Sequence, residues 1–273
     1  MNAPLIDIGV NLTSKQFRVD LPEVIARALG AGVEHMIVTG LTAPLSQQAL
    51  QLARSHPAHL ASTAGVHPHN AAGFGQHTRD QLRNLARQPE VVAVGECGLD
   101  YDRDFSPRPE QRLAFELQLE LAIELQKPVF LHQRSAHDDF FRILRNARPK
   151  LCGGVVHCFT GSAAELSCYL ELGLCIGITG FVCDERRGTH LQQLIKQIPS
   201  DRLMVETDAP FLLPRDLKGV SGRRNEPAYL PHVAASVARY AGRSELDVRR
   251  ETTATAFRLF DLAGRFGSAR AEK

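Results

Sequence analysis

The sequence predicts an α/β fold, a (β/α)8 TIM barrel. Eight short apolar runs typical of strands alternate with segments of helical periodicity, and the length of 273 residues is one that a single barrel commonly occupies. Strict alternation of strand and helix predicts a parallel sheet. Eight units in so short a chain favour a closed barrel over a doubly wound open sheet, which stays the alternative.

The predicted strands are short and apolar, as strands buried on both faces are. They are LIDIGV (5–10), HMIVTG (35–40), LASTAGVHP (60–68), VVAVGECG (91–98), PVFLHQR (128–134), GGVVHCF (153–159), CIGITGF (175–181) and LMVETDAP (203–210).

Helical periodicity is clearest over 110–126, where leucines recur every four residues and predict a buried apolar stripe. The leucines of this stripe are Leu113, Leu117, Leu121 and Leu125. The predicted helices 21–32 and 163–173 end in glycine, the favoured stop signal.

A long irregular segment, 212–231, follows the eighth strand, and two closing helices are predicted over 232–242 and 246–260. Low-complexity linkers are absent from the sequence. We therefore expect a single domain over 1–264 and a frayed tail over 265–273.

The composition is ordinary for a globular protein, with 44% hydrophobic and 23% charged residues and a net charge of +2. The sequence has no apolar run of roughly 18 residues and opens without a signal-peptide pattern, which predicts a cytoplasmic protein without a membrane partner. The six cysteines form no CxxC pair. Reduced thiols are therefore expected, without a structural zinc site built from cysteines.

Polar side chains follow the apolar part of six predicted strands. They are Asp7 and Asn11, His67 and His69, Glu96 and Asp100, His132 and Arg134, His157, and Glu206 and Asp208. The carboxyl ends of barrel strands meet at one rim, and that rim carries the active site in this fold. We therefore expect these side chains to converge.

Taken singly, each of these residues has an ordinary explanation, such as a histidine hydrogen-bonded in the core or an aspartate that caps the next helix. Imidazole and carboxylate groups from four strands are instead the ligand set of a divalent metal. The candidate ligands are Glu96, His132, His157 and Asp208. A cation would also compensate the charge of Glu96, a carboxylate that ends a buried run.

Several long motifs resemble the TatD family of metal-dependent nucleases, which are amidohydrolase-like barrels. They are TAGVHPH (63–69), VGECGLDYDRDF (94–105), the glutamine- and leucine-rich run through 111–134, HCFTGS (157–162), GITGFVCDERRG (177–188), ETDAPFLLPRDL (206–217) and RRNEP (223–227). The opening DIGVNLTSKQF (7–17) resembles one branch of this family. The resemblance implies hydrolysis of phosphodiester bonds from the 3′ end of single-stranded DNA or RNA, and a role in DNA repair.

The first motif departs from the broader family, whose members mostly begin Asp-x-His-x-His with two histidines on the first metal. Here Gly9 and Asn11 occupy the matching positions. Glycine has no donor atom, and a carboxamide is a weak ligand for a transition metal. The remaining ligands favour Mg²⁺, with Mn²⁺ as a substitute, and two-metal catalysis becomes doubtful unless the substrate brings a second ion.

The predicted catalytic residues are Glu96 and Asp208. Glu96 would hold the cation with His132 and His157, and Asp208 would accept a proton from the attacking water as general base. Glu206 precedes Asp208 by two residues on the same face and would orient a neighbouring group.

Candidate contacts to the substrate phosphate are His67, His69, Arg134, Arg186 and Arg187. His67 carries the most weight because GVHPH belongs to the resemblance, whereas paired arginines are equally common on solvated surfaces. Phenylalanines near the rim are candidates for base stacking, although packing is the commoner role. Near-neutral charge and the absence of tryptophan favour a cleft for a few nucleotides at a free end.

Three other interpretations stay open. A metal-dependent amidohydrolase acting on a cyclic amide or lactone would use the same barrel, although such enzymes often carry a lysine on strand four, where this chain has Glu96. An aminoacyl-tRNA ester hydrolase would use the same ligands. A non-catalytic scaffold for nucleic acid would explain Gly9 and Asn11 but not four buried polar groups at strand ends. Oligomeric state is not predicted.

Overall fold

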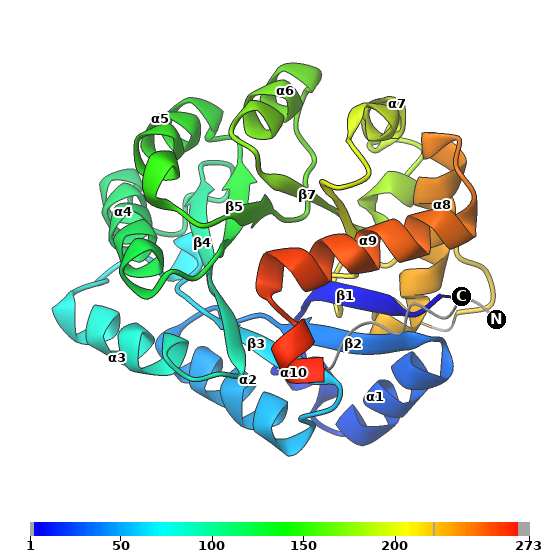
Figure 1. Ribbon diagram of the computed structural model, residues 1–273, viewed down its shortest axis with the longest axis horizontal. Coiled ribbons are helices and arrows are strands. Elements are labelled where there is room, and N and C mark those ends of the chain that lie inside the picture. Colours follow the sequence, from blue (N-terminus) through cyan, green and yellow to red (C-terminus); the bar gives the residue numbers. More distant parts are fainter. Residues whose placement is uncertain (1–2, 221, 267–273) are drawn as a thin grey trace.

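The computed structural model describes residues 3–220 and 222–266, and its eight strands form one parallel sheet in the order β1 to β8. Helices surround the strands, as Figure 1 shows. The strands are β1 (Leu5–Val10), β2 (Val33–Val38), β3 (Leu60–Ala64), β4 (Val91–Asp100), β5 (Val129–Arg134), β6 (Gly154–Val156), β7 (Cys175–Ile178) and β8 (Leu203–Val205).

A helix follows each strand, and two more end the described chain. They are α1 (Leu21–Gly30), α2 (Ala43–Ser55), α3 (Gln76–Ala86), α4 (Arg108–Leu125), α5 (His137–Ala147), α6 (Ala163–Glu171), α7 (Thr189–Leu194), α8 (Leu230–Ala241), α9 (Glu245–Phe260) and α10 (Ala263–Phe266). None of the described helices is long and apolar enough to cross a membrane. Of the predicted tail 265–273, residues 267–273 lie outside the described residues, whereas Arg265 and Phe266 belong to α10.

Backbone hydrogen bonds join the two ends of the sheet at the carboxyl-terminal rim. The N–H of Asp208 donates to the carbonyl of Gly9 at 2.9 Å, and the N–H of Asn11 donates to the carbonyl of Ala209 at 2.8 Å. These bonds connect β1 to the segment after β8. The predicted (β/α)8 barrel is therefore confirmed, and the doubly wound open sheet is excluded.

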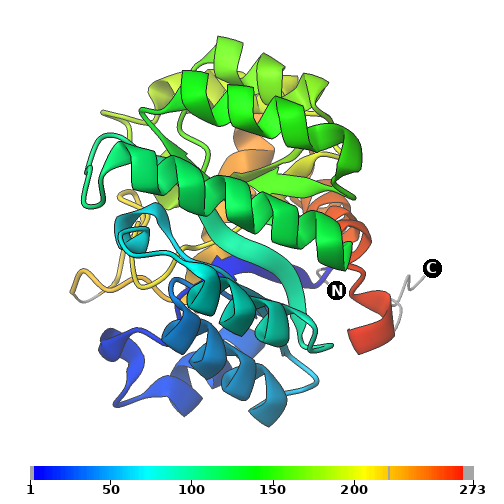
Figure 2. The ribbon, with the colours of Figure 1, turned by 90° about the vertical axis from the view of Figure 1, so that its left-hand side faces the viewer.

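Apolar side chains fill the barrel interior toward the amino ends of the strands. Ile6, Ile8 and Phe130 pack there with Phe260 of α9 and Leu262. The helix pair α9–α10 covers this end (Figure 1), while the long loop after β8, yellow to orange, projects at the opposite side (Figure 2). Each fully buried side chain of this size contributes about 1.5–3 kcal/mol. Among the described residues, the open end of the barrel is therefore the rim where the polar residues gather.

The predicted stripe of α4 is wrong in detail, because Leu113 is 50% exposed. The buried face carries Phe115 and Leu119 together with two glutamines, Gln111 and Gln118. A strict four-residue repeat drifts around a helix of 3.6 residues per turn, so it does not stay on one face. The glutamines are buried because they hydrogen-bond the backbone of the rim, which the leucine pattern does not reveal.

The later strands are shorter than predicted. β6 ends at Val156 and β8 at Val205. His157 and the segment Glu206–Asp208 therefore lie just beyond the last paired residues, on the rim. There the backbone is free to turn side chains into the opening.

Candidate metal centre

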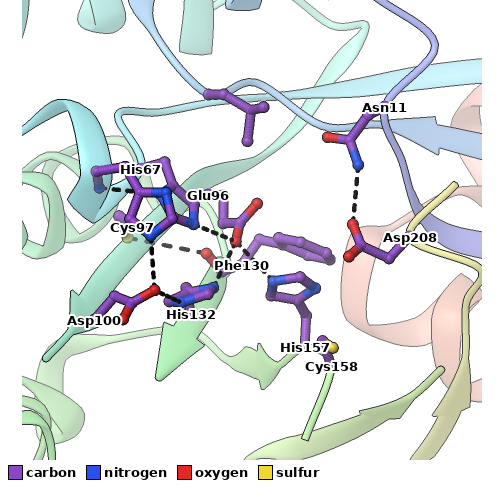
Figure 3. Close-up of polar contacts among 12 residues, drawn as sticks. Asn11, His67, Glu96, Cys97, Asp100, Phe130, His132, His157, Cys158 and Asp208 are labelled. Carbon is purple, nitrogen blue, oxygen red and sulfur yellow. Dashed lines mark hydrogen bonds and ion pairs between the residues drawn. The ribbon is translucent and has the colours of Figure 1, made fainter. Parts of the chain in front are cut away.

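A cleft of about 760 Å³ opens at the carboxyl-terminal rim of the barrel. Five of the polar residues that line it are contributed by different strands or strand ends, as Figure 3 shows for Asn11, Glu96, His132, His157 and Asp208. The structure thus brings together residues up to 197 positions apart in the chain.

Three imidazole nitrogens surround one oxygen of Glu96, which is 4% exposed. Oε1 lies 2.9 Å from His132 Nδ1, 2.7 Å from His157 Nε2 and 3.3 Å from His67 Nε2. Three rings therefore converge on the Glu96 carboxylate (Figure 3).

The close approach of β4 and β5 sets this geometry. Gly98 pairs with His132 across the two strands. A Cβ at Gly98 would lie 1.9 Å from the carbonyl oxygen of His132, and its φ of +145° disfavours other residues. The glycine lets β4 pass close enough to β5 to set Glu96 against His132.

His67 and His69 occupy the loop after β3. The Nδ1 of His67 accepts the N–H of His69 at 3.1 Å, which leaves its Nε2 directed at Glu96. The ring of His69 is held by Asp100, with Nε2 and Oδ2 2.7 Å apart. Gln118 of α4 fixes the loop by hydrogen bonds to both backbone groups of Val66. His67 therefore belongs with the group around Glu96, which the sequence did not predict.

Asp208 lies across the cleft from the histidines, beside Asn11 (Figure 3). The Nδ2 of Asn11 donates to Asp208 Oδ1 at 2.9 Å. The pKa of Asp208 is raised to about 7, chiefly by burial; the charges of Glu96 and Glu206 add to the rise, whereas His157 and Asn11 oppose it. The φ of Asp208 is 54°, a left-handed conformation that is unusual outside glycine and often found at functional sites.

Glu206 occupies the space beneath His157 and is fully buried. Its Oε2 lies 3.3 Å from His157 Nδ1, and its Oε1 accepts the N–H of Cys158. A Cβ at Gly9 would lie 2.4 Å from Glu206 Oε2. The position where the broader family carries a histidine is thus next to the Glu206 carboxylate, which leaves no room for a side chain unless Glu206 moves.

The two carboxylates and the histidines have perturbed protonation. Burial alone would raise the pKa of Glu96, but His157 and His67 hold it well below its usual range. Burial would lower the pKa of His157, but Glu96 and Glu206 raise it well above 6.5. The pKa of His67 falls to about 4, mainly through burial. The pKa of His132 is raised as well, by Asp100 and Glu96, so in the metal-free protein the protons around Glu96 reside on His157 and His132 rather than on the carboxylate or His67.

The residues fit a divalent metal. Ligand atoms of His67, Glu96 and His132 lie within 4.8 Å of one another. The Nε2 of His132 is buried without a hydrogen-bond partner among the described residues, although Asp100 Oδ2 is 3.4 Å away. The ring thus presents Nδ1 to Glu96, where a cation would bind, and turns Nε2 toward a carboxylate, the arrangement in which an acidic residue orients a metal-bound histidine.

Of the three arginines predicted to contact the substrate phosphate, two line the cleft and one does not. Arg134 and Arg187 line the cleft and are about half or more exposed, paired with Asp102 at 2.8 Å and Asp184 at 2.9 Å. Arg186 is 66% exposed and is not among the described residues lining the cleft. Both loop arginines lie next to Asp184, so the local positive charge is partly neutralised.

Sequence reasoning missed three features of the cleft. Arg103 lines it, although only its place in the motif 94–105 pointed to it. Asp100 orients His69, and Asn11 contacts Asp208, neither of which spacing could show. Asp7 was expected at the rim but lies below it, where Oδ1 accepts the N–H of Thr207 at 2.9 Å.

The chain matches the family model described as TatD related DNase over residues 6–261. It is 53% identical to the protein named 3′-5′ ssDNA/RNA exonuclease TatD from Klebsiella pneumoniae (strain 342), over 94% of this chain and 98% of that protein. Among solved structures, a TatD family hydrolase from Entamoeba histolytica superposes with a TM-score of 0.87 at 27% identity, covering 95% of this chain and 99% of that one. A TatD homologue from Escherichia coli K12 gives 0.85 at 29% identity, over 94% and 98%.

A family model that spans almost the whole barrel, a relative with half of its residues identical over nearly its full length, and a rim lined with the residues of the family's motifs agree with one another. The chain belongs to the TatD-related DNase family.

Proposed function

We propose that the chain is a metal-dependent 3′-to-5′ exonuclease that hydrolyses single-stranded DNA and RNA. The carrying observation is the convergence of three imidazole nitrogens on one oxygen of Glu96 at the floor of the cleft. Family membership and the printed activity of the relative with 53% identity support the same reaction.

A divalent cation would be held by Glu96, His132 and His157, with Asp208 opposite and His67 as an added ligand. When bound, such a cation polarises the scissile phosphate and lowers the pKa of a coordinated water. We propose Mg²⁺ for its abundance and preference for carboxylates, while the three imidazoles suit Mn²⁺ as well.

Asp208 would accept the proton of the attacking water. A pKa of about 7 allows a carboxylate to take up a proton near neutral pH, which one of ordinary acidity does poorly. Asn11 holds Asp208 through its Oδ1, which leaves the other carboxylate oxygen for the water. Glu96 remains ionised and supplies charge rather than proton transfer.

Two exposed phenylalanines at the cleft support a single-stranded substrate. Phe105 is 67% and Phe211 52% exposed, and both line the cleft. Aromatic rings that solvent can reach give unpaired bases a surface for stacking, worth about 1–3 kcal/mol per base. Arg134 and Arg187 would exchange their carboxylate partners for backbone phosphates. His69, fixed by Asp100 beside Phe105, would contact the terminal phosphate.

The test uses metal-stripped protein with single-stranded oligonucleotides labelled at the 3′ or the 5′ end, with and without Mg²⁺ or Mn²⁺. The proposal expects metal-dependent release of the 3′ label as mononucleotide and a stepwise ladder from the 5′-labelled strand. Loss of the 5′ label first, or internal cuts, would contradict the stated polarity.

The same protein tested on a dihydropyrimidine, a lactone and an aminoacyl-tRNA separates the alternative hydrolases. Turnover of one of these without nuclease activity would overturn the proposal, as would oligonucleotide binding without any product. Roles in the cytoplasm and in DNA repair stay predictions.

A further inference from the structure

A second group of metal-ligating side chains lies outside the cleft. Cys183, Asp216 and His232 each offer a ligand atom, and these atoms lie within 4.8 Å of one another. None of the three is among the described residues that line the cleft. We propose that they form a separate site for Zn²⁺ or a similar transition metal.

Three segments distant in sequence build this group. Cys183 ends the short 3-10 helix Gly180–Cys183 after β7, Asp216 lies in the loop after β8, and His232 lies in the first turn of α8. Residues this far apart in sequence have no characteristic spacing, so the sequence did not indicate this group. It argued only against a zinc site built from cysteines alone.

Small side-chain movements would bring the three ligand atoms to the spacing around a tetrahedral cation. His232 Nε2 and Asp216 Oδ1 are 2.6 Å apart, and Cys183 Sγ lies 3.4 Å from Ser236 Oγ. Bonds of about 2.0–2.3 Å around zinc place ligand atoms roughly 3.3–3.8 Å apart. The aspartate and histidine need to separate by about 1 Å and the sulfur to approach. Rotations of these side chains would be enough to produce such shifts.

The burial pattern leaves room for the fourth ligand. Cys183 is 3% exposed, whereas the side chains of His232 and Asp216 are 27% and 31% exposed. Water can therefore complete the coordination from the solvent side. The Cys183 thiol would release its proton to solvent as the sulfur binds the metal.

The donor set separates the two sites chemically. The ligands proposed in the cleft, Glu96, His132 and His157, offer nitrogen and oxygen atoms, which accept Mg²⁺ or Mn²⁺, whereas a sulfur ligand selects softer ions. A metal here would fasten the loops after β7 and β8 to α8. Those two loops carry Phe181, Arg187 and Phe211, which line the cleft.

Cobalt provides a direct test, because a thiolate bound to Co²⁺ gives a charge-transfer band in the near ultraviolet. Metal-stripped full-length protein titrated with Co²⁺ should develop this band. Cys183→Ser should abolish it, and His232→Gln and Asp216→Asn should weaken Co²⁺ binding at least about tenfold, as loss of one ligand does. Circular dichroism verifies that each variant is folded.

Cys158→Ser is the matched control, because Cys158 lines the catalytic cleft and could itself contribute a thiolate. The band should survive this change and also survive Glu96→Ala, which disables the cleft. No band in the unmodified protein would overturn the proposal. A band that persists in Cys183→Ser, or that disappears in Cys158→Ser, would overturn it too.

Discussion

Two acidic side chains face each other across the cleft in opposite environments. Glu96 receives three imidazole nitrogens, and its pKa lies well below the usual range. Asp208 receives one amide from Asn11, and its pKa rises to about 7. When their environments shift the pKa values of two carboxyl groups in opposite directions, one group can supply a fixed negative charge and the other can transfer a proton. The experiments below break or sharpen this division, beginning with the largest effect.

Glu96→Ala should cause the greatest loss. Without this carboxylate, the three histidines lose their common partner and the cation its central ligand. We expect nuclease activity to fall by about 10³-fold or more and tight metal binding to disappear. Calorimetric metal titration and oligonucleotide cleavage measure both. Glu120→Ala, on the exposed face of α4, serves as the control and should change neither. Normal oligonucleotide cleavage by the Glu96 variant would contradict the role assigned to Glu96 in contrast to Asp208.

Asp208→Asn should damage catalysis more than metal binding. The amide keeps the shape of the side chain but cannot accept the proton, so we expect kcat to fall by about 10²–10⁴-fold. Metal affinity should fall less than in Glu96→Ala. Equal losses of affinity in the two variants would show that both carboxylates act as ligands of the same kind.

The pH dependence of metal binding tests the imidazole side of the comparison. The pKa values of His132 and His157 are raised above 6.5, so a cation must displace their protons. Apparent affinity should therefore rise between about pH 6 and 8, by up to tenfold per unit for each proton released. In the metal-free protein the stability of the fold depends on pH in the opposite direction. The same protons stabilise the fold at low pH, and that contribution is lost as pH rises through the raised values.

Calorimetry of Mn²⁺ binding in buffers of different ionisation enthalpy counts the protons released. Affinity that is flat across this range, without proton release, would contradict the assigned protonation of the histidines.

Asn11→Ala should have the smallest effect of the three substitutions. Its amide lowers the pKa of Asp208, so removal should shift the acidic limb of the rate profile to higher pH. We expect about a tenfold loss of activity at neutral pH, as for other residues that orient a catalytic group. Asn84→Ala, at an exposed position of α3, is the control and should leave the profile unchanged. A loss of activity without a shift of the profile would mean that Asn11 acts only through packing.

The convergence of Glu96, His132 and His157 could be predicted because it follows from their positions. Each ends an apolar run, and parallel strands of a barrel bring such ends to one rim. The interpretation needed no side-chain detail. The same reasoning identified Glu206 as a neighbour of the site, where it lies 3.3 Å from His157.

Orientation could not be predicted in the same way. His67 turns toward Glu96 because its other nitrogen accepts the N–H of His69, a local bond that spacing does not encode. The contact of Asn11 with Asp208 depends on closure of the barrel between β1 and β8. The buried face of α4 was predicted wrongly because its glutamines hydrogen-bond the backbone of the rim. Polar residues on this face are therefore buried and support the rim, rather than facing solvent.

The apolar seal that α9 and α10 form beneath the strands has a further consequence. Within the part of the chain that the structure describes, Phe260 and Leu262 close the barrel below the site, so a molecule that enters from the rim finds no second exit there. A nucleotide freed at the floor therefore departs by the route along which its parent strand arrived.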